Sequence, residues 1–152
     1  MRDDERWMEF AIAEARAAGA AGEVPVGAVI VRDNEVIARA GNRNLRDQDP
    51  TGHAEMIVMR DVAARLGVGR LDGCSLYVTL EPCAMCAGAI VLARLDRVVF
   101  GAWDPKAGMA GSIVDLLRHP KLNHRPEVRG GVLEQECGDL LTTFFRARRA
   151  KD

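Results

Sequence analysis

The chain lacks the features that mark membrane proteins, exported proteins and proteins that coat nucleic acids. Its net charge is −1, from 21 Lys and Arg against 22 Asp and Glu, so it has no bulk positive charge with which to coat nucleic acid. Its longest run without a charged residue is twelve residues, 82–93, which is too short to span a bilayer. The first ten residues are acidic and contain no apolar segment of signal-peptide length. We therefore expect no membrane association, no export and a cytoplasmic location.

Cysteine is also scarce. Four cysteines, Cys74, Cys83, Cys86 and Cys137, are too few for a secreted disulfide scaffold, and without export their thiols should stay reduced. Cys83 and Cys86 form a Cys-Ala-Met-Cys motif, a spacing that indicates metal binding or redox chemistry. Cys74 lies in an expected strand and Cys137 near the last expected helix, so we interpret both as core thiols.

The remaining composition is that of a globular protein, with 48% hydrophobic and 28% charged residues, and its length predicts one domain, 1–152. Hydrophobic periodicity and turn signals predict helices over 4–19, 51–66, 83–93 and 134–151, and strands over 24–31, 35–40, 74–80 and 97–101. Weaker signals suggest a short helix over 113–118 and a strand over 131–133. Strands that alternate with helices after an opening hairpin predict an α/β fold, a three-layer sandwich with a mixed central sheet.

Two of the predicted helices begin with residues that can ligate zinc. His53 stands at the start of the helix expected from Thr51, and Cys83 and Cys86 stand at the start of the next one. One imidazole and two thiolates suit Zn²⁺, which prefers tetrahedral N and S donors, and helix N-termini favour the thiolate form. Three protein ligands leave a fourth position for water, whose pKa zinc lowers from 15.7 to about 7. The pattern therefore predicts a catalytic zinc site.

Glu55 is the candidate for moving a proton from that water to a leaving amine. Residues two apart on a helix point to nearly opposite sides, so this role requires the metal to lie off the helix end, where first-turn side chains converge. A Cys-x-x-Cys pair alone also fits a redox dithiol or a buried pair, but a redox dithiol needs no upstream His-x-Glu. A structural zinc would need a fourth ligand. The available residues for that ligand are Cys74, Cys137, His119 and His124.

The sequence resembles the signature of the zinc-dependent nucleoside and nucleobase deaminases in two motifs, His53-Ala-Glu55 and Pro82-Cys83-x-x-Cys86. This resemblance implies the deamination chemistry of that family. Within the cytidine and deoxycytidylate deaminase family, the sequence resembles the bacterial tRNA adenosine deaminases nearly from end to end. The matching segments are 25–31, 49–55, 77–89, 97–102 and the carboxyl-terminal Phe-Phe-Arg-Ala-Arg-Arg.

This resemblance implies a cytidine deaminase-like fold with a five-stranded sheet, a homodimer, and one Zn²⁺ per subunit held by His53, Cys83 and Cys86. It implies that Glu55 shuttles the proton while adenosine becomes inosine at the wobble position of a tRNA anticodon stem-loop. A hairpin loop suits such an enzyme because its bases are already unstacked. Gly52 and Met109 depart from the family pattern, because the family usually has Ala at the first position and a loop of small residues at the second. Neither departure removes a catalytic atom.

Six residues are candidates for contacts with the RNA. Asn42 can pair with a base or ribose, although an Asn that satisfies a turn is equally common. Two positions in the glycine-rich loop match family contacts to flanking nucleotides, and one Phe of the last helix can stack on a base. The arginines at the end of that helix are too concentrated for dipole complementation alone, which favours phosphate binding. The candidates are Asn42, Asp104, Lys106, Phe145, Arg146 and Arg149.

Two other functions stay open at this point. The zinc motif is shared with small-molecule deaminases of guanine or cytidine type, which would show no salt-sensitive binding of tRNA. A non-catalytic zinc module that binds RNA or protein would have no inosine-forming activity to lose on Glu55→Ala. The charge distribution favours RNA, because residues 142–152 carry four basic groups and one acidic group, and a neutral total therefore excludes only nonspecific coating. A second basic stretch, 118–129, fits phosphate binding and plain surface solvation equally well.

Overall fold

The computed structural model describes residues 3–151, in which helices and strands alternate after an opening hairpin. The predicted domain, 1–152, extends beyond the described part only by residues 1, 2 and 152. In chain order the elements are α1 (Asp4–Ala20), β1 (Gly27–Arg32), β2 (Glu35–Gly41), α2 (Ala54–Leu66), β3 (Ser75–Leu80), α3 (Ala84–Ala93), β4 (Arg97–Ala102), β5 (Glu127–Arg129) and α4 (Glu134–Lys151).

The strands form one mixed sheet in the order β2-β1-β3-β4-β5. The pairs β1–β2 and β1–β3 are antiparallel, whereas β3–β4 and β4–β5 are parallel. Asp33 and Asn34 join β1 to β2 with φ angles of 50° and 62°, the left-handed backbone that a tight hairpin turn requires. The parallel pair β3–β4 needs a crossover connection, and α3 supplies it.

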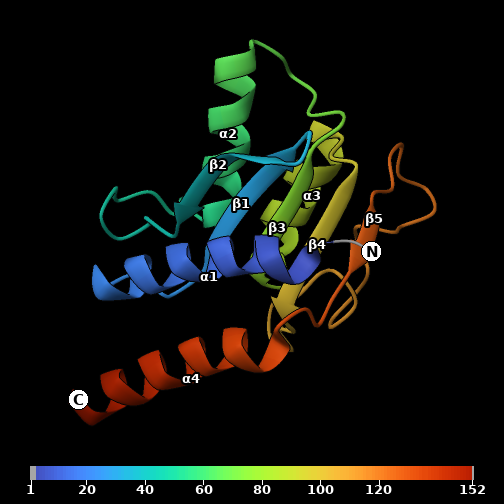
Figure 1. Ribbon diagram of the computed structural model, residues 1–152. Coiled ribbons are helices and arrows are strands. Elements are labelled where there is room, and N and C mark those ends of the chain that lie inside the picture. The colour runs from blue at the N-terminus through green and yellow to red at the C-terminus, as the bar shows by residue number, and fades with distance from the viewer. Residues whose placement is uncertain (1–2, 152) are drawn as a thin grey trace.

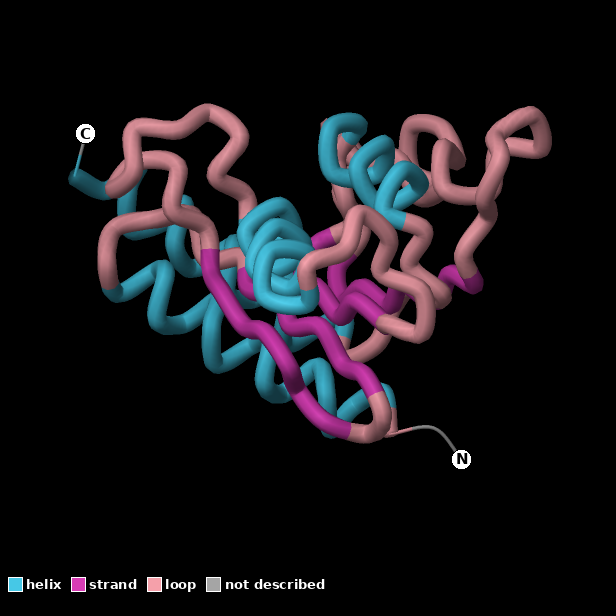
Figure 2. Tube along the Cα trace, turned by 90° about the horizontal axis from the view of Figure 1, so that it is seen from above, coloured by secondary structure: helices cyan, strands magenta, loops and turns pink. Residues whose placement is uncertain are grey.

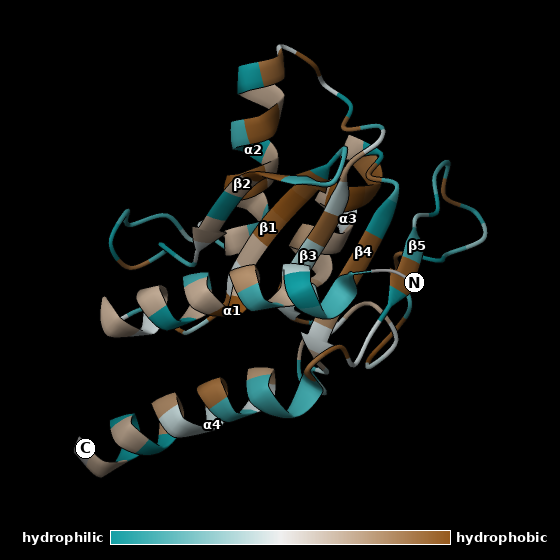
Figure 3. Ribbon diagram, in the orientation of Figure 1, coloured by the Kyte–Doolittle hydropathy of each residue, from teal (hydrophilic) through white to brown (hydrophobic). Residues whose placement is uncertain are grey.

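Helices cover both faces of this sheet (Figures 1 and 2). On one face α1 and α4 enclose a core that includes Trp7, Ile12 and Val29, and on the other α2 and α3 enclose a core that includes Val58 and Leu76. A strand that is buried on both faces consists mostly of apolar residues. In Figure 3 most of β1 has the brown shades of hydrophobic residues. The predicted three-layer α/β/α sandwich with a five-stranded mixed sheet is confirmed.

A buried ion cluster fastens the start of α1 to the sheet. The carboxylate of Asp4 accepts hydrogen bonds from Tyr77 on β3, Arg97 on β4 and Arg129 on β5. The partners come from three neighbouring strands, so a single side chain fixes the N-terminal helix across half of the sheet.

Two of the weaker predictions are wrong. The last strand is Glu127–Arg129 and not 131–133, because pairing with β4 aligns Glu127 with Arg97, and the chain then turns into α4 with Leu133 at φ 52°. Residues 113–118 form no helix. Their backbone bonds run elsewhere, from Leu116 to Met109 and from Ile113 to Gly108, so the helical i to i−4 ladder does not form.

All four cysteines lie within the described residues, where none of them is paired in a disulfide. No helix among residues 3–151 combines the length and the apolar character that a membrane crossing needs.

Candidate metal centre and catalytic pocket

The N-termini of α2 and α3 bring the predicted zinc ligands together. His53 is the N-cap residue of α2 and Cys83 is the N-cap residue of α3, each with an extended backbone. Thr51 does not cap α2 as predicted, because its hydroxyl bonds to Asp49 at 2.7 Å. The N-cap residue His53 does not have helical backbone angles, which is why His53 and Glu55 can face the same site although they are two residues apart.

The three donor atoms have the spacing of a zinc site. His53 Nδ1 lies 3.6 Å from the Sγ atoms of both Cys83 and Cys86, and all three donors lie within 4.8 Å of one another. Tetrahedral coordination with Zn–N and Zn–S bonds of about 2.0–2.3 Å places N and S about 3.6 Å apart. The donor set and its spacing therefore both fit Zn²⁺.

The local electrostatics prepare Cys83 as a thiolate. The hydrogen bond from the Cys86 thiol lowers the pKa of Cys83 to about 3, although burial of the sulfur acts in the opposite direction. The same hydrogen bond, together with burial, raises the pKa of Cys86. The hydrogen bond with Cys83 raises the pKa of His53. The cluster thus holds a negative sulfur beside an imidazole, which is the charge pattern that attracts a cation.

Glu55 is buried beside this cluster with an unused oxygen. The residue is 3% exposed, and its carboxyl group reaches the thiol of Cys86. Its Oε1 atom has no hydrogen-bond partner among the described residues. Burial raises the pKa of this carboxyl group. Leaving a buried polar atom unpaired is costly, so the atom marks a position for a ligand or a reactant.

A cavity of about 210 Å³ joins these groups to the surface loops. Its lining includes His53, Glu55 and Cys83, with apolar walls from Val24 and Leu80. The geometry thus combines a metal-ligand cluster, an unpaired carboxylate oxygen and apolar walls in one pocket.

Asn42 and Asp104 also line this pocket, but each is partly used by the protein. Asn42 Oδ1 accepts from the backbone N–H of Ala54 at 2.9 Å, which caps α2, and its Nδ2 donates to Val24. Asp104 Oδ1 accepts from the backbone of Lys106 and Ala107. An amide nitrogen has two N–H groups and each oxygen has two lone pairs, so both side chains keep capacity for a substrate. Lys106 is exposed outside the pocket lining.

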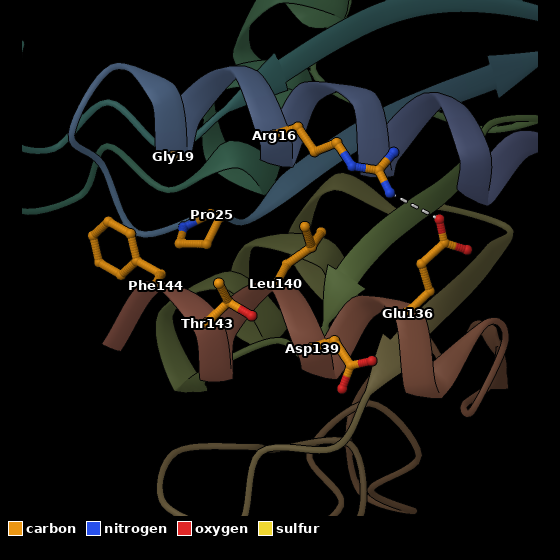
Figure 4. A pocket seen from close by; sticks show the side chains of 8 residues that line it. All are labelled: Arg16, Gly19, Pro25, Glu136, Asp139, Leu140, Thr143 and Phe144. Carbon is orange, nitrogen blue, oxygen red and sulfur yellow. Dashed lines mark hydrogen bonds and ion pairs between the residues drawn. The ribbon is translucent and has the colours of Figure 1, made fainter. Parts of the chain in front are cut away.

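The structure does not bring the carboxyl-terminal candidates to the pocket of the same chain. Phe145, Arg146 and Arg149 are exposed on the distal part of α4, which extends away from the sheet (Figure 1). The neighbouring Phe144 lies beside Pro25 in a separate groove of about 450 Å³ between α1 and α4 (Figure 4).

Two buried glutamates that the sequence argument missed hold the loops around the pocket. Glu23 is 0% exposed and accepts from the backbone N–H groups of Leu45 and Arg46, which orders the loop before α2. Glu81 is 2% exposed and binds the loop after β4. The sequence offers one signal for these residues, because Glu23 and Glu81 each stand next to an apolar run. Such a position fits a turn as well as a buried carboxylate, and it does not show which groups the carboxylate binds.

The two departures from the family pattern have different surroundings. A Cβ atom at Gly52 would lie 3.1 Å from backbone atoms of Asn44 and Asp49, so the loop before α2 packs tightly against the glycine. Met109 is partly buried against the core. Both changes are accommodated by packing around the pocket and leave the donor atoms in place.

Residues 1–102 match the family model of the cytidine and deoxycytidylate deaminase zinc-binding region. Together with the three-layer fold and the His-Cys-Cys cluster, this match defines the class as a zinc-dependent deaminase with a cytidine deaminase-like fold. The chain is also 52% identical over 151 residues to a tRNA-specific adenosine deaminase of Bacillus subtilis, covering 99% of this chain and 94% of the relative.

Solved structures agree with this assignment. One comes from studies of A-to-I editing by tRNA:A34 deaminases at the wobble position of transfer RNA. It superposes with a TM-score of 0.86 at 49% identity, covering 90% of this chain and 99% of the other. A guanine deaminase from Bacillus subtilis has a TM-score of 0.66 at 37% identity, covering 81% and 78%. The chain belongs to the tRNA-specific adenosine deaminases of the cytidine and deoxycytidylate deaminase family.

Proposed function

We propose that the chain deaminates adenosine to inosine in tRNA, at the wobble position of the anticodon loop. His53, Cys83 and Cys86 hold one Zn²⁺ per subunit, and Glu55 carries the proton. The observation that supports this most strongly is the buried, unpaired Oε1 of Glu55 beside a cluster with zinc spacing. The names of the relatives supply the substrate, because both the Bacillus subtilis protein and the tRNA:A34 enzyme are described as acting on tRNA adenosine.

The reaction adds water to C6 of adenine and releases ammonia. Zinc, when bound, lowers the pKa of a coordinated water to about 7 and so supplies a nucleophile at neutral pH. The Glu55 carboxylate takes one proton of the attacking water and delivers it to the ring nitrogen next to C6, where it stays in inosine. It then moves the second proton of the same oxygen to the departing amine, so that the C–N bond breaks and ammonia leaves. The apolar side chains of Val24 and Leu80 keep bulk water from the reacting atoms. The remaining N–H of Asn42 is available to the base or ribose.

The size of the pocket favours an unstacked base as the substrate. A cavity of about 210 Å³ admits a single base and not a stacked helix, so the target must be turned out of the RNA. An anticodon loop offers such bases at low cost. Asp104 and Lys106 contact the flanking nucleotides, and Phe145, Arg146 and Arg149 bind the RNA through stacking and phosphate contacts.

We also propose that residues 1–152 act as a single deaminase domain in the cytoplasm, where tRNA is used, and as a homodimer. The helix α3 carries no charged residue, and its Leu92 is 81% exposed. Met85, Ala89 and Leu92 recur at helical spacing and are all at least partly exposed, so α3 presents a contiguous apolar stripe, which marks a surface that a partner covers. Dimerisation also enlarges the surface that one RNA loop can contact.

The activity is tested with an anticodon stem-loop that carries adenosine at the wobble position. We expect inosine from this RNA, and none from the same loop with wobble guanosine or from free adenosine, guanine or cytidine. Glu55→Gln should keep one zinc per chain and lose at least about 10²-fold in kcat, whereas Glu35→Gln, at an exposed strand position, should retain full activity. Deamination of free guanine or cytidine without conversion of the RNA would instead identify a small-molecule deaminase.

Zinc binding is tested separately. Cys83→Ser and Cys86→Ser should each lose the metal and the activity together, as measured by metal analysis and inosine formation. A fully active, metal-free variant would refute the mechanism. Zinc retention and RNA binding with no turnover by the wild-type protein would indicate a non-catalytic module.

A further inference from the structure

A second buried carboxylate, that of Glu81, lines the same pocket as Glu55. Glu55 has an oxygen without a hydrogen-bond partner in the described part of the chain, whereas both oxygens of Glu81 accept hydrogen bonds. Glu81 follows β3 and stands two residues before the zinc ligand Cys83. Its Oε1 accepts from the backbone N–H of Asp104 at 2.9 Å and from the hydroxyl of Ser112. Its Oε2 accepts from the backbone N–H groups of Ala110 at 2.9 Å and Ser112 at 3.0 Å.

These four donors separate the role of Glu81 from that of Glu55. A carboxylate has about four lone-pair sites on its two oxygens, so the described donors occupy Glu81 fully. Glu55, in contrast, keeps an oxygen without a partner. The Glu81 side chain is therefore not available to take a proton from a reactant or to bind the base. Its interactions are directed to one segment, the loop over residues 102–112.

That loop is closely wrapped around the carboxylate. A Cβ atom at Gly108 would lie 2.2 Å from both Cδ and Oε1 of Glu81, so only glycine allows this approach. The backbone adds further bonds between the two segments, from Glu81 N–H to the carbonyl of Ala102 at 2.9 Å and from Met109 N–H to the carbonyl of Pro82 at 2.8 Å.

The two segments that Glu81 joins both contribute residues to the pocket lining. Leu80, Glu81 and Cys83 belong to the segment that carries a zinc ligand, while Asp104 and Ala107 belong to the loop. The position of Asp104 relative to Cys83 thus depends on the bonds that the Glu81 carboxylate makes. A neutral or shorter side chain at residue 81 would leave several buried N–H groups without an acceptor.

We infer that Glu81 is a positioning residue for RNA deamination. Its carboxylate fixes the loop 102–112 against the zinc-ligand segment and thereby sets the wall of the pocket that receives the nucleotides around the target adenosine. This inference rests on the proposed function. It assigns Glu81 no contact with the reacting atoms and no role in the metal cluster.

Glu81→Gln tests the inference because the amide keeps the shape but turns one acceptor into a donor that faces N–H groups. We expect the KM for the anticodon stem-loop to rise about tenfold or more, since small displacements of a positioning group cost 10- to 100-fold. The zinc content should stay at one per chain, and kcat at saturating RNA should change less than about threefold, because Glu55 is untouched. A purely structural role would instead lower the melting temperature and the active fraction without changing KM.

Gly108→Ala perturbs the same contact from the loop side and leaves the carboxylate intact. It should give the same KM-selective defect, and it tests the inference even where Glu81→Gln fails to fold. The new methyl group would also meet the backbone carbonyl oxygen of Asp104 at 2.6 Å, so this variant displaces the loop itself while the Glu81 side chain keeps its length and charge. Gly69→Ala, where a Cβ has open space, is the matched control and should behave as the wild type.

The outcomes separate this inference from the proposed function. Normal KM values in both Glu81→Gln and Gly108→Ala, with an active wild type, overturn the inference alone. A wild-type enzyme that forms no inosine from any RNA overturns both proposals.

Discussion

Replacing Asp4 with asparagine removes the charge that joins α1 to three strands of the sheet. Asp4 is 1% exposed. Its carboxylate accepts from the Tyr77 hydroxyl at 2.9 Å, from Arg97 at 2.5 and 2.8 Å, and from Arg129 at 2.6 Å. Burial alone would raise the pKa of Asp4, but the hydrogen bonds from Arg97, Arg129 and Tyr77 outweigh burial and lower it to about 2.

The shift gives the size of the effect. A pKa that falls from 3.8 to about 2 stabilises the folded state by about 2.4 kcal/mol at neutral pH, since each unit corresponds to about 1.36 kcal/mol. Because the folded pKa lies below the unfolded one, this stabilisation is complete above about pH 4 and is lost as the pH falls through about 2. Asparagine also leaves Arg97, whose side chain is 11% exposed, with Glu127 as its remaining acidic partner.

We therefore expect Asp4→Asn to lower the free energy of unfolding at pH 7 by about 2–4 kcal/mol and the melting temperature by about 5–15 °C. Denaturant unfolding followed by circular dichroism measures the difference between wild type and variant from pH 7 to pH 2.5, and the contribution of the zinc site cancels in that difference. Asp3→Asn is the matched control, because its side chain is 56% exposed and 4.0 Å from Arg6. Its effect should stay below about 0.5 kcal/mol.

The reasoning fails if Asp4→Asn costs less than about 1 kcal/mol at pH 7. It also fails if the cost at pH 2.5 equals the cost at pH 7, since protonation of Asp4 must erase most of the difference.

Three further predictions concern packing, RNA affinity and assembly. Gly101→Ala places a Cβ 2.4 Å from Cys137 Sγ and should lower the free energy of unfolding by about 1–3 kcal/mol. Gly138→Ala, in open space on α4, should raise it by about 0.5–1 kcal/mol. Equal shifts of the melting temperature in the two variants contradict this prediction. Arg149→Ala should reduce the slope of log affinity against log salt for the stem-loop by about 0.7–0.9, and an unchanged slope excludes a phosphate contact. Leu92→Glu should convert the dimer to a monomer in sedimentation, and a monomeric wild type refutes the proposed interface.

The secondary structure could be predicted wherever a local sequence pattern determines it. The prediction was wrong where a residue far away in the sequence determines it. The helix from Glu134 and the hairpin at Asp33 follow from periodicity and turn chemistry. The start of α2 does not, because the group that caps Ala54 is the side chain of Asn42, twelve residues earlier. The last strand also depends on a distant partner, since a three-residue strand is selected by its alignment with β4.

The candidate site shows the same division. The spacing His-x-Glu and Cys-x-x-Cys predicted four residues that the structure brings together, because two helix starts are enough to bring such motifs into one cluster. The loop around Glu81 could not be predicted, since its donors lie 23 to 31 residues further along the chain. Residues 113–118 form no helix because Ile113 and Leu116 donate to the backbone of Gly108 and Met109 in the preceding loop.

The pocket and the arginines of α4 lie in different parts of the molecule, and this explains how a chain with a net charge near zero can bind RNA. The pocket selects the base through a small cavity with a buried carboxylate, and selection of this kind needs no positive charge. The arginines of α4 lie on the part of the helix that extends away from the sheet (Figure 1). The proposed phosphate contacts therefore require the RNA to extend from the pocket to this helix, or to the corresponding helix of the proposed second subunit. Affinity and selection then reside in different parts of the molecule. Substitutions in α4 should consequently change KM and salt dependence but not which base is deaminated, whereas substitution of Glu55 in the pocket should remove the deamination itself.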